Sequence, residues 1–371
     1  MVLVNKDTMP EERVRRMFLG GNTFQGFFSH YDYILGQKEA SKIICIKGGP
    51  GTGKSTFMRK IGLKMLDLGY NVEFMHCSSD SSSLDGIVIP KIKVALVDGT
   101  YPHIVDPKNP GAVDEIINLG DFWDEKGIRK NKTEILKINK KTKKAFESAY
   151  RYIKAAHIIY QDNEDIIKNF CCNRGKINRI AAEVEREMFF GQNIATHEGG
   201  VRRLFAGAIT PEGYVNHLDT LIRTDKVYAF NGVPEIQIQH MLEGFKTRAV
   251  QRGFDVEAFY CALNPNKLEH LIIPGLGTSF TTSNEFHSRK AEGTQDININ
   301  DCLDTGDYLG IIERNRISYR QLLATAIDHL SLAKGLHESL ESLYIPYMDF
   351  NAVQECYEST LKKISRISSK D

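Results

Sequence analysis

Residues 43–56 read IICIKGGPGTGKST and contain the spacing Gly-x-x-x-x-Gly-Lys-Ser. The apolar run at 43–46 is typical of a strand buried on both faces of a parallel sheet. The residues that follow, FMRKIGLKMLDLGY, have the apolar spacing of a helix. A glycine-rich turn between such a strand and helix directs backbone N–H groups at phosphate oxygens, near the positive end of the helix dipole. The stretch therefore predicts a phosphate-binding loop (P-loop) in an α/β fold.

The residues of this loop have separate expected roles. Lys54 would reach the β- and γ-phosphates of a nucleotide, and the Ser55 hydroxyl would ligate Mg²⁺. No Asn/Thr-Lys-x-Asp segment that reads guanine occurs, so we expect ATP and Mg²⁺ as cofactors. The predicted nucleotide-binding residues are Gly48, Gly49, Pro50, Gly51, Thr52, Gly53, Lys54, Ser55 and Thr56.

A second carboxylate is needed near the metal, at the end of a neighbouring strand. Residues 92–98 read IKVALVD, so Asp98 follows an apolar run at the edge where α/β sheets bind ligands. Ser55 and Asp98 are the predicted metal ligands; the alternative is that Asp98 only begins a turn. Because Gly99 and not glutamate comes next, the group that orients an attacking water must lie elsewhere.

Three residues are candidates for that catalytic role beside Lys54 and Asp98. Asp80 and Asp85 are predicted in a serine-rich loop after the second strand, where aspartate also often caps a turn. His103 could sense the γ-phosphate or be a structural residue. The Asp-Glu pair at 114–115 follows a Pro-Gly pair and is expected to begin a helix.

The chain also contains an internal repeat. At an offset of 184, residues 43–103 align with 227–287 without a gap. Upstream, Phe24-x-Gly26 matches Phe205-x-Gly207, and downstream Lys154-x-x-His157 matches Lys334-x-x-His337. The repeat predicts two copies of one fold, each a mostly parallel sheet flanked by helices.

The second copy lacks the residues that bind phosphate and metal. Loss of the lysine removes the counter-charge of the phosphates, and side chains would crowd the loop. We therefore expect a degenerate, pseudo-NTPase second domain. It has Glu235, Gln237, Ile238 and Gln239 where the first copy has Gly51, Gly53, Lys54 and Ser55, and Thr282 where the first has Asp98.

Each core is followed by a long segment with helical periodicity, which predicts a helical arm. The expected domains are 1–195, with a core at 15–122 and an arm at 123–190, and 196–371, with a core at 200–300 and an arm at 305–371. Residues 126–154 carry eleven Lys or Arg against two Glu. This segment is either a surface for nucleic acid or a protein partner, or the solvated face of a helix.

Composition narrows the class of protein. The 371 residues are 42% hydrophobic with a net charge of +1, which gives no general affinity for nucleic acid or anionic membranes. The N-terminal stretch lacks a secretory apolar region, and no apolar run approaches the ~20 residues of a membrane span. The seven scattered cysteines argue against a disulfide framework and a zinc ribbon. We expect a cytoplasmic protein with no membrane partner.

Four stretches carry a resemblance to a known family: KGGPGTGKST at 47–56, LVDGTYPHIVDPKNPGAVDEIINLGDFW at 96–123, RRLFAGAITPEG at 202–213 and AKGLHESLESLYIPYMDF at 333–350. Across nearly its whole length the chain resembles an uncharacterised bacterial family of tandem P-loop ATP-binding proteins. The resemblance implies a P-loop NTPase fold and ATP binding at 48–56. Because the second loop has lost its motif here, it does not imply a second site.

Three functions are compatible with these residues. The first is an ATPase whose single site drives rearrangement against the second half and the arms. The second is a small-molecule or nucleotide kinase, since residues 98–103 (DGTYPH) are similar to the Asp-Gly-x-Pro-Arg strand end of adenylate-kinase-like enzymes, although histidine replaces the arginine. The third is a nucleotide-gated binding module with little turnover. We rank them in that order.

Overall fold

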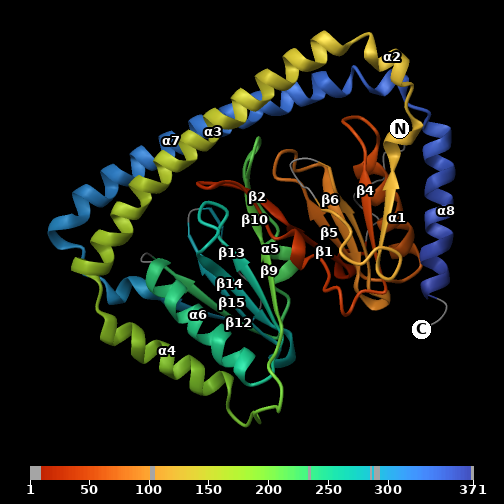
Figure 1. Cartoon of the computed structure of the whole chain (residues 1–371). Coiled ribbons are helices and arrows are strands. Elements are labelled where there is room, and N and C mark those ends of the chain that lie inside the picture. Colours follow the sequence, from red (N-terminus) through yellow and green to blue (C-terminus); the bar gives the residue numbers. More distant parts are fainter. Residues whose placement is uncertain (1–9, 101–104, 233–234, 285, 288–292, 369–371) are drawn as a thin grey trace.

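The computed structural model describes residues 10–100, 105–232, 235–284, 286–287 and 293–368. Twelve strands of this part of the chain form one mixed sheet (Figure 1). Those of the first half are β1 (Val14–Phe18), β4 (Lys42–Lys47), β5 (Val72–His76), β6 (Leu84–Ile89), β7 (Val94–Asp98) and β8 (Asp114–Asn118). Those of the second half are β9 (Val201–Phe205), β12 (Lys226–Asn231), β13 (Val256–Tyr260), β14 (Leu268–Ile273), β15 (Thr278–Ser283) and β16 (Thr294–Asn298). The expected α/β class is confirmed.

The two halves of the sheet have the same strand order. From the centre outward, one side is β1-β5-β6-β7-β4-β8 and the other is β9-β13-β14-β15-β12-β16. A single antiparallel pair joins them, at Phe18 of β1 and Phe205 of β9. In each half one strand, β6 or β14, is antiparallel to both neighbours, whereas β4 and β12 pair in parallel on both sides. The sheet order therefore repeats, as the offset of 184 in the sequence predicts.

The prediction for the Asp-Glu pair at 114–115 is wrong. These residues begin strand β8, in which Asp114 lies opposite Ile43 of β4. The Asp114 carboxylate accepts the backbone N–H groups of Lys108 and Asn109, so the residues of the expected helix cap instead form a loop that leads into a strand. The β-branched Ile116 and Ile117 continue that strand.

The upstream match of the repeat is also wrong. A hairpin of β2 (Gly20–Thr23) and β3 (Gly26–Ser29) has its counterpart in β10 (Gly207–Thr210) and β11 (Gly213–Asn216). Phe205-x-Gly207 therefore corresponds to Phe18-x-Gly20 and not to Phe24-x-Gly26, because Phe18 and Phe205 each end the strand at the junction. The offset between equivalent residues is therefore 187 here, three more than the 184 of the first alignment.

Two long helices form the predicted arms. Helix α3 (Lys132–Ile166) lies antiparallel against α7 (Leu309–Glu341), and together they span both halves of the sheet (Figure 1). The Asn131 side chain donates to the carbonyl of Leu343 at one end, and that of Asn163 donates to the carbonyl of Ile312 toward the other. Two further helices, α2 (Glu125–Arg129) and α5 (Leu218–Leu221), are short and do not belong to this pair.

Each arm ends on the core of the other half. Helix α8 (Phe350–Ser368), which follows α7, packs on α1 (Lys54–Asp67), and its fully buried Ile364 joins the first core. Helix α4 (Arg174–Met188), which follows α3, packs on α6 (Glu235–Gln251), where Glu185 pairs with Arg248 at 2.6 Å. The domain boundaries expected from the sequence stay predictions. The structure adds that the helix covering each core comes from the other half of the chain (Figure 1).

Four charged residues pair at the junction of the halves. Arg15 and Arg202 each contact both Glu73 and Glu257. The side chains of Glu73 and Glu257 are 4% and 13% exposed, so the cluster is largely dry and each charge depends on its partners.

None of the described helices is both long enough and apolar enough to cross a lipid bilayer.

Candidate functional site

The loop at residues 48–53 connects β4 to α1 as the sequence predicts. Gly48, Gly51 and Gly53 have φ values of 150°, 70° and 86°, which favour glycine. A Cβ on Gly48 would lie 2.7 Å from Oγ1 of Thr52, whose hydroxyl donates to the carbonyl of Gly49 at 2.9 Å. The loop thus turns tightly and leads directly into the N-terminus of α1, whose first N–H groups have no partner within the helix.

Lys54 and Asp98 meet at this loop. Strands β4 and β7 are parallel neighbours, with Ile46 opposite Asp98, so the carboxylate lies at the carboxyl end of the sheet beside the loop. Lys54 Nζ lies 3.7 Å from Asp98 Oδ2 and donates to the carbonyls of Gly48 at 2.8 Å and Gly49 at 3.0 Å. The ammonium group therefore sits inside the turn of the loop, where a phosphate would gain a counter-charge.

The two predicted metal ligands border the same loop. Ser55 Oγ accepts the N–H of Leu84, the first residue of β6, at 2.9 Å. Asp98 Oδ1 accepts the N–H of Thr100 at 2.8 Å, and the Thr100 hydroxyl donates to the carbonyl of Gly48 at 3.0 Å. Ser55 from α1 and Asp98 from β7 are thus held by hydrogen bonds to neighbouring segments, with Lys54 between the loop and Asp98.

Asp80 is bound by its own loop and by an arm. Its carboxylate accepts the hydroxyls of Ser82 and Ser83, both at 2.8 Å, and pairs with Lys334 of α7 at 3.0 Å. Lys334 also pairs with Glu212, which follows β10. These bonds act against the burial that alone would raise its pKa, and the pKa of Asp80 is lowered. Asp80 links the arm to the loop after β5.

The placement predicted for Asp85 is wrong. It is the second residue of β6, where a bulge shifts the register against β5, and it is 3% exposed. Burial, and after it the nearby Asp85 carboxylate, raise the pKa values of Tyr31 and Cys77. Strand β6 begins directly after a short serine-rich turn, so its first residues were predicted to belong to that loop. His103, the remaining catalytic candidate, lies outside the described residues.

The sequence did not reveal that the end of the other half covers the loop. A Cβ on Gly51 would lie 2.9 Å from Ile345 and 3.2 Å from the carbonyl oxygen of Glu341, at the end of α7. Gly49 faces Trp123 and Tyr344 in the same way. The loop after β4 is therefore in contact with the joint between α7 and α8.

A two-stranded bridge holds this joint in place. Trp123 pairs with Met348, the N–H of Asp124 donates to the carbonyl of Tyr347 at 2.7 Å, and the N–H of Asp349 donates to the carbonyl of Phe122 at 2.8 Å. An open cleft of about 490 Å³ lies along this bridge. The only signal for this contact in the sequence was the length of the two arms.

The equivalent loop of the second half is built differently. Ile238, at the position of Lys54, is 1% exposed and belongs to the second hydrophobic core. A Cβ on Gly232 would lie 2.5 Å from Asn300 Oδ1, and Gln239 donates to the carbonyl of Asn266 at 3.3 Å. Thr282, at the position of Asp98, contacts His287 at 2.9 Å. Packing and neutral hydrogen bonds replace the charges of the first half.

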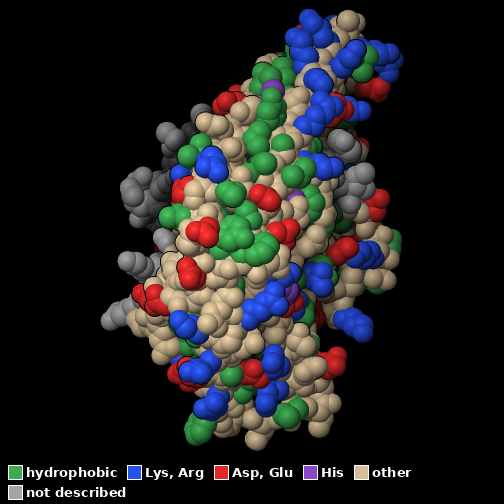
Figure 2. Space-filling view, turned by 90° about the vertical axis from the view of Figure 1, so that its left-hand side faces the viewer, with side chains coloured by type: hydrophobic (Ala, Val, Ile, Leu, Met, Phe, Trp, Pro, Cys, Tyr) green, Lys and Arg blue, Asp and Glu red, His purple; other side chains and the backbone are tan. Residues whose placement is uncertain are grey.

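The basic segment at 126–154 is mostly exposed. Its Lys and Arg side chains surround α2 and the first half of α3, and Figure 2 shows such side chains gathered at the upper end of the molecule. Ile135 and Ile138 are the buried face of α3 there, packed against Leu340 of α7. The segment is thus an amphipathic helix with a basic outer face.

Comparisons with family models, with curated proteins and with solved structures found no match for this chain. Its function must therefore be inferred from the site itself.

Proposed function

We propose that the protein binds Mg-ATP at a single site in its first half and hydrolyses it. The observation that carries the proposal is the meeting of Lys54, Asp98 and a loop of left-handed glycines at the N-terminus of α1. Lys54 supplies a cation, Asp98 a carboxylate on the neighbouring strand, and the loop a set of backbone donors. These three groups at one sheet edge fit a nucleoside triphosphate with its metal.

The residues present fit both cofactors. A side chain at Gly48 would collide with Thr52, so the loop keeps the bare backbone that phosphate oxygens require. Residues 48–56 would hold the phosphates, and the Ser55 hydroxyl with the Asp98 carboxylate would hold Mg²⁺. When bound, the metal would neutralise charge that develops on the phosphates.

We further propose that the second half does not bind Mg-nucleotide. Ile238 is buried in the core where a phosphate-binding lysine would be needed, and Asn300 fills the space beside Gly232. The second half instead contributes the joint between α7 and α8 that covers the P-loop. Nucleotide at the loop would compete with its carbonyls for Lys54 and so alter the surface on which that joint packs.

The proposal predicts release of phosphate from Mg-ATP by the full chain. Lys54→Ala and Asp98→Asn should each lower the turnover at least about tenfold, because each removes a charge that acts at the transferred phosphate or its metal. Lys60→Ala, on the exposed face of α1, is the matched control and should keep the turnover of the unmodified protein. Equal turnover in Lys54→Ala would contradict the proposal.

Labelled ATP separates the two other functions. A kinase would transfer the label to an acceptor other than water, whereas an ATPase releases it as phosphate. A nucleotide-gated module would retain ATP with little turnover, and the exposed basic face of α3 favours an acidic partner for it. Retention of ATP together with salt-sensitive capture of RNA or DNA would therefore replace the ATPase proposal with this one.

A further inference from the structure

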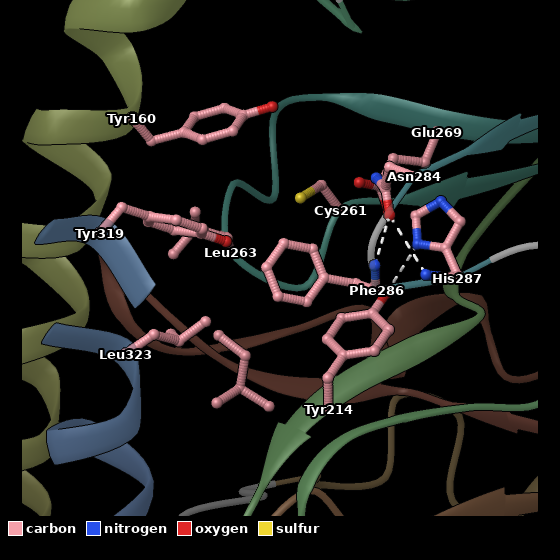
Figure 3. Close-up of a pocket in the computed structure, with 11 residues that line it drawn as sticks. Tyr160, Tyr214, Cys261, Leu263, Glu269, Asn284, Phe286, His287, Tyr319 and Leu323 are labelled. Atoms are coloured by element: carbon pink, nitrogen blue, oxygen red, sulfur yellow. Dashed lines mark hydrogen bonds between the residues drawn. The ribbon is translucent and has the colours of Figure 1, made fainter. Parts of the chain in front are cut away.

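A small, partly open cavity lies in the second half, between the sheet and the two arms (Figure 3). Its volume is about 30 Å³, which is room for one or two water molecules and far too little for a nucleotide. Apolar and aromatic side chains line one part of it, and Glu269 and His287 line another. Figure 3 shows Glu269, Asn284 and His287 grouped on the same side of the cavity.

Three potential metal ligands meet at this polar side of the cavity. Glu269, His270 and His287 are each no more than 4% exposed, and one ligand atom of each lies within 4.8 Å of the others. Neighbours in a regular strand point to opposite faces, but β14 has a register shift against β13 at these two residues. Such a bulge re-aims side chains, which explains how Glu269 and His270 reach the same point.

Two consecutive threonines orient the two histidine rings. The Thr281 hydroxyl lies 3.1 Å from the carbonyl oxygen of Thr282 and 2.8 Å from His270 Nδ1. When the hydroxyl donates to that carbonyl, it accepts the Nδ1 proton of His270, and Nε2 presents its lone pair. Thr282 Oγ1 contacts His287 Nε2 at 2.9 Å, and Nδ1, whose contact with the Tyr214 hydroxyl is longer at 3.5 Å, would be the ligand atom of that ring. A hydrogen-bond partner on the far ring nitrogen, here a threonine hydroxyl, fixes the orientation of a metal-binding histidine.

The carboxylate of Glu269 gives a second, independent indication. It is 4% exposed and forms no ion pair within the described part of the chain, although the Cys261 thiol lies beside it. A buried carboxylate is costly unless a cation or a metal accompanies it. A divalent cation between Glu269 and the two imidazoles would supply the missing charge.

We propose that Glu269, His270 and His287 form a zinc-binding site. Two histidines and one carboxylate with a water in the fourth position are a common ligand set of Zn²⁺. Ligand distances of about 2.0–2.2 Å place tetrahedral ligand atoms about 3.4 Å apart, so the ion draws the three side chains together by up to about 1.4 Å. The cavity supplies room for the water.

Within its described residues, the first half lacks one of the two histidines and its threonine partner. The position of His270 is occupied by Gly86, and that of Thr281 by Val97, which lie opposite each other in β6 and β7 as His270 and Thr281 do in β14 and β15. The carboxylate is kept as Asp85, and His287 aligns with His103, which lies outside the described residues; the positions of His270 and Thr281 have no counterpart that could bind or orient a metal ligand. The zinc site is therefore particular to the half that lacks the P-loop residues.

Zinc content of the full-length protein tests the proposal. The chain is stripped with a chelator, dialysed against Zn²⁺ in the presence of a competing indicator, and its bound zinc is measured. We expect one tightly bound zinc per chain. His270→Gln should lose it, with at least about a hundredfold weaker binding, and Thr281→Val should weaken it about 10–100-fold, because it removes the group that orients His270.

His157→Gln is the matched control. His157 is also a buried histidine, stacked on Phe24 at 3.9 Å, but lies on α3 outside the cluster. The His157→Gln variant should bind zinc as tightly as the unmodified protein. Circular dichroism checks that each variant is folded. Thr281→Val preserves side-chain shape, so it tests the site even if His270→Gln does not fold. Absence of tight zinc in the unmodified chain, or equal zinc in all variants, would overturn the proposal.

Discussion

The turn after β4 and the turn after β12 occupy the same place in the two halves, yet one is charged and the other is packed. Lys54 lies between loop carbonyls and Asp98, whereas its counterpart Ile238 is buried in a hydrophobic core. At the adjacent strand end, Asp98 has been replaced by Thr282, which contacts a histidine. The same strand order therefore carries a lysine–aspartate pair on one side and a buried polar cluster on the other.

This difference shows that one strand order can carry two different sets of side chains at equivalent positions. Both halves keep a bulge at the same point of the sheet, at Asp85 and at Glu269, and both place a carboxylate there beside a cysteine. Among the many differences between them, those in the loop after β4 or β12 and at the end of β7 or β15 separate the two sites. The following tests break or sharpen that comparison.

The largest effect we expect is acid destabilisation of the junction. His30 and His217 are equivalent residues of the two halves, and each lies against the phenylalanine of the other. Burial, and next a nearby arginine, lower the pKa of each to about 4, and burial followed by His217 lowers that of His76 to about 3.

These histidines bind protons in the unfolded chain at a pH where the folded chain keeps them neutral. The free energy of unfolding should therefore be highest above pH 6.5 and fall toward pH 4, by up to about 1.4 kcal/mol per pH unit for each histidine. Urea unfolding across this range measures it. A double His30→Gln, His217→Gln variant should have a flatter profile, and an unchanged profile would show that other groups cause the loss.

The next effect comes from the charged cluster at the junction. Glu73→Gln should lower the free energy of unfolding by about 3–5 kcal/mol, because it leaves Arg15 and Arg202 with one carboxylate between them. Burial alone would raise the pKa of Glu73, but the two arginines outweigh it and lower the pKa. Its contribution is thus present at neutral pH and lost below the ordinary range of glutamate.

The equivalent change in the second half is the control for this cluster. The Glu257 side chain is 13% exposed against 4% for Glu73, so Glu257→Gln should cost less in urea unfolding at neutral pH. Equal costs would mean that the two halves share the junction symmetrically.

A third test compares substitutions at two equivalent positions, Lys54 in the first half and Ile238 in the second. Ile238→Ala should lower the free energy of unfolding by about 2–5 kcal/mol and leave ATP affinity intact, since it opens a cavity in the second core. Lys54→Ala should lower the free energy of unfolding less than Ile238→Ala, because it opens no cavity in a hydrophobic core. Denaturation and ATP titration of both variants should give opposite patterns. A loss of ATP binding in Ile238→Ala would contradict the division of roles.

The smallest effect on stability is expected at the arm. Lys334→Ala breaks the pairs with Asp80 and Glu212 and should change the free energy of unfolding by less than about 1 kcal/mol, because these groups are partly exposed. It should nevertheless alter ATP turnover if the arm senses the loop after β5. Lys154→Ala, at the matching position of α3, is exposed and should leave turnover unchanged.

Much of the fold follows from local sequence. The loop between β4 and α1, the strand that ends at Asp98 and the repeated strand order were all predictable, because buried apolar runs and glycine turns are read from neighbouring residues. The two wrong predictions, for Asp114 and Asp85, occurred where the local sequence pattern of a strand was weak. Asp114 begins a strand whose apolar residues come after it, and Asp85 lies in a strand directly after a serine-rich turn.

The exchange of the arms could not be predicted in this way. That α8 packs on the first core depends on contacts such as Ile364 with the side chains of α1, which are about 300 residues away in the sequence. The cluster at Glu269 was missed for a related reason: a bulge and two threonines from the next strand bring its members together. Periodicity within one segment carries no information on either arrangement.

The central claim is that one half of the chain binds nucleotide and the other does not. The number of Mg-ATP molecules bound per full-length chain, measured by calorimetric titration, tests it most directly. We predict one ATP per chain in the unmodified protein and loss of that binding in Lys54→Ala. Two ATP molecules per chain, or undiminished binding in Lys54→Ala, would contradict the account.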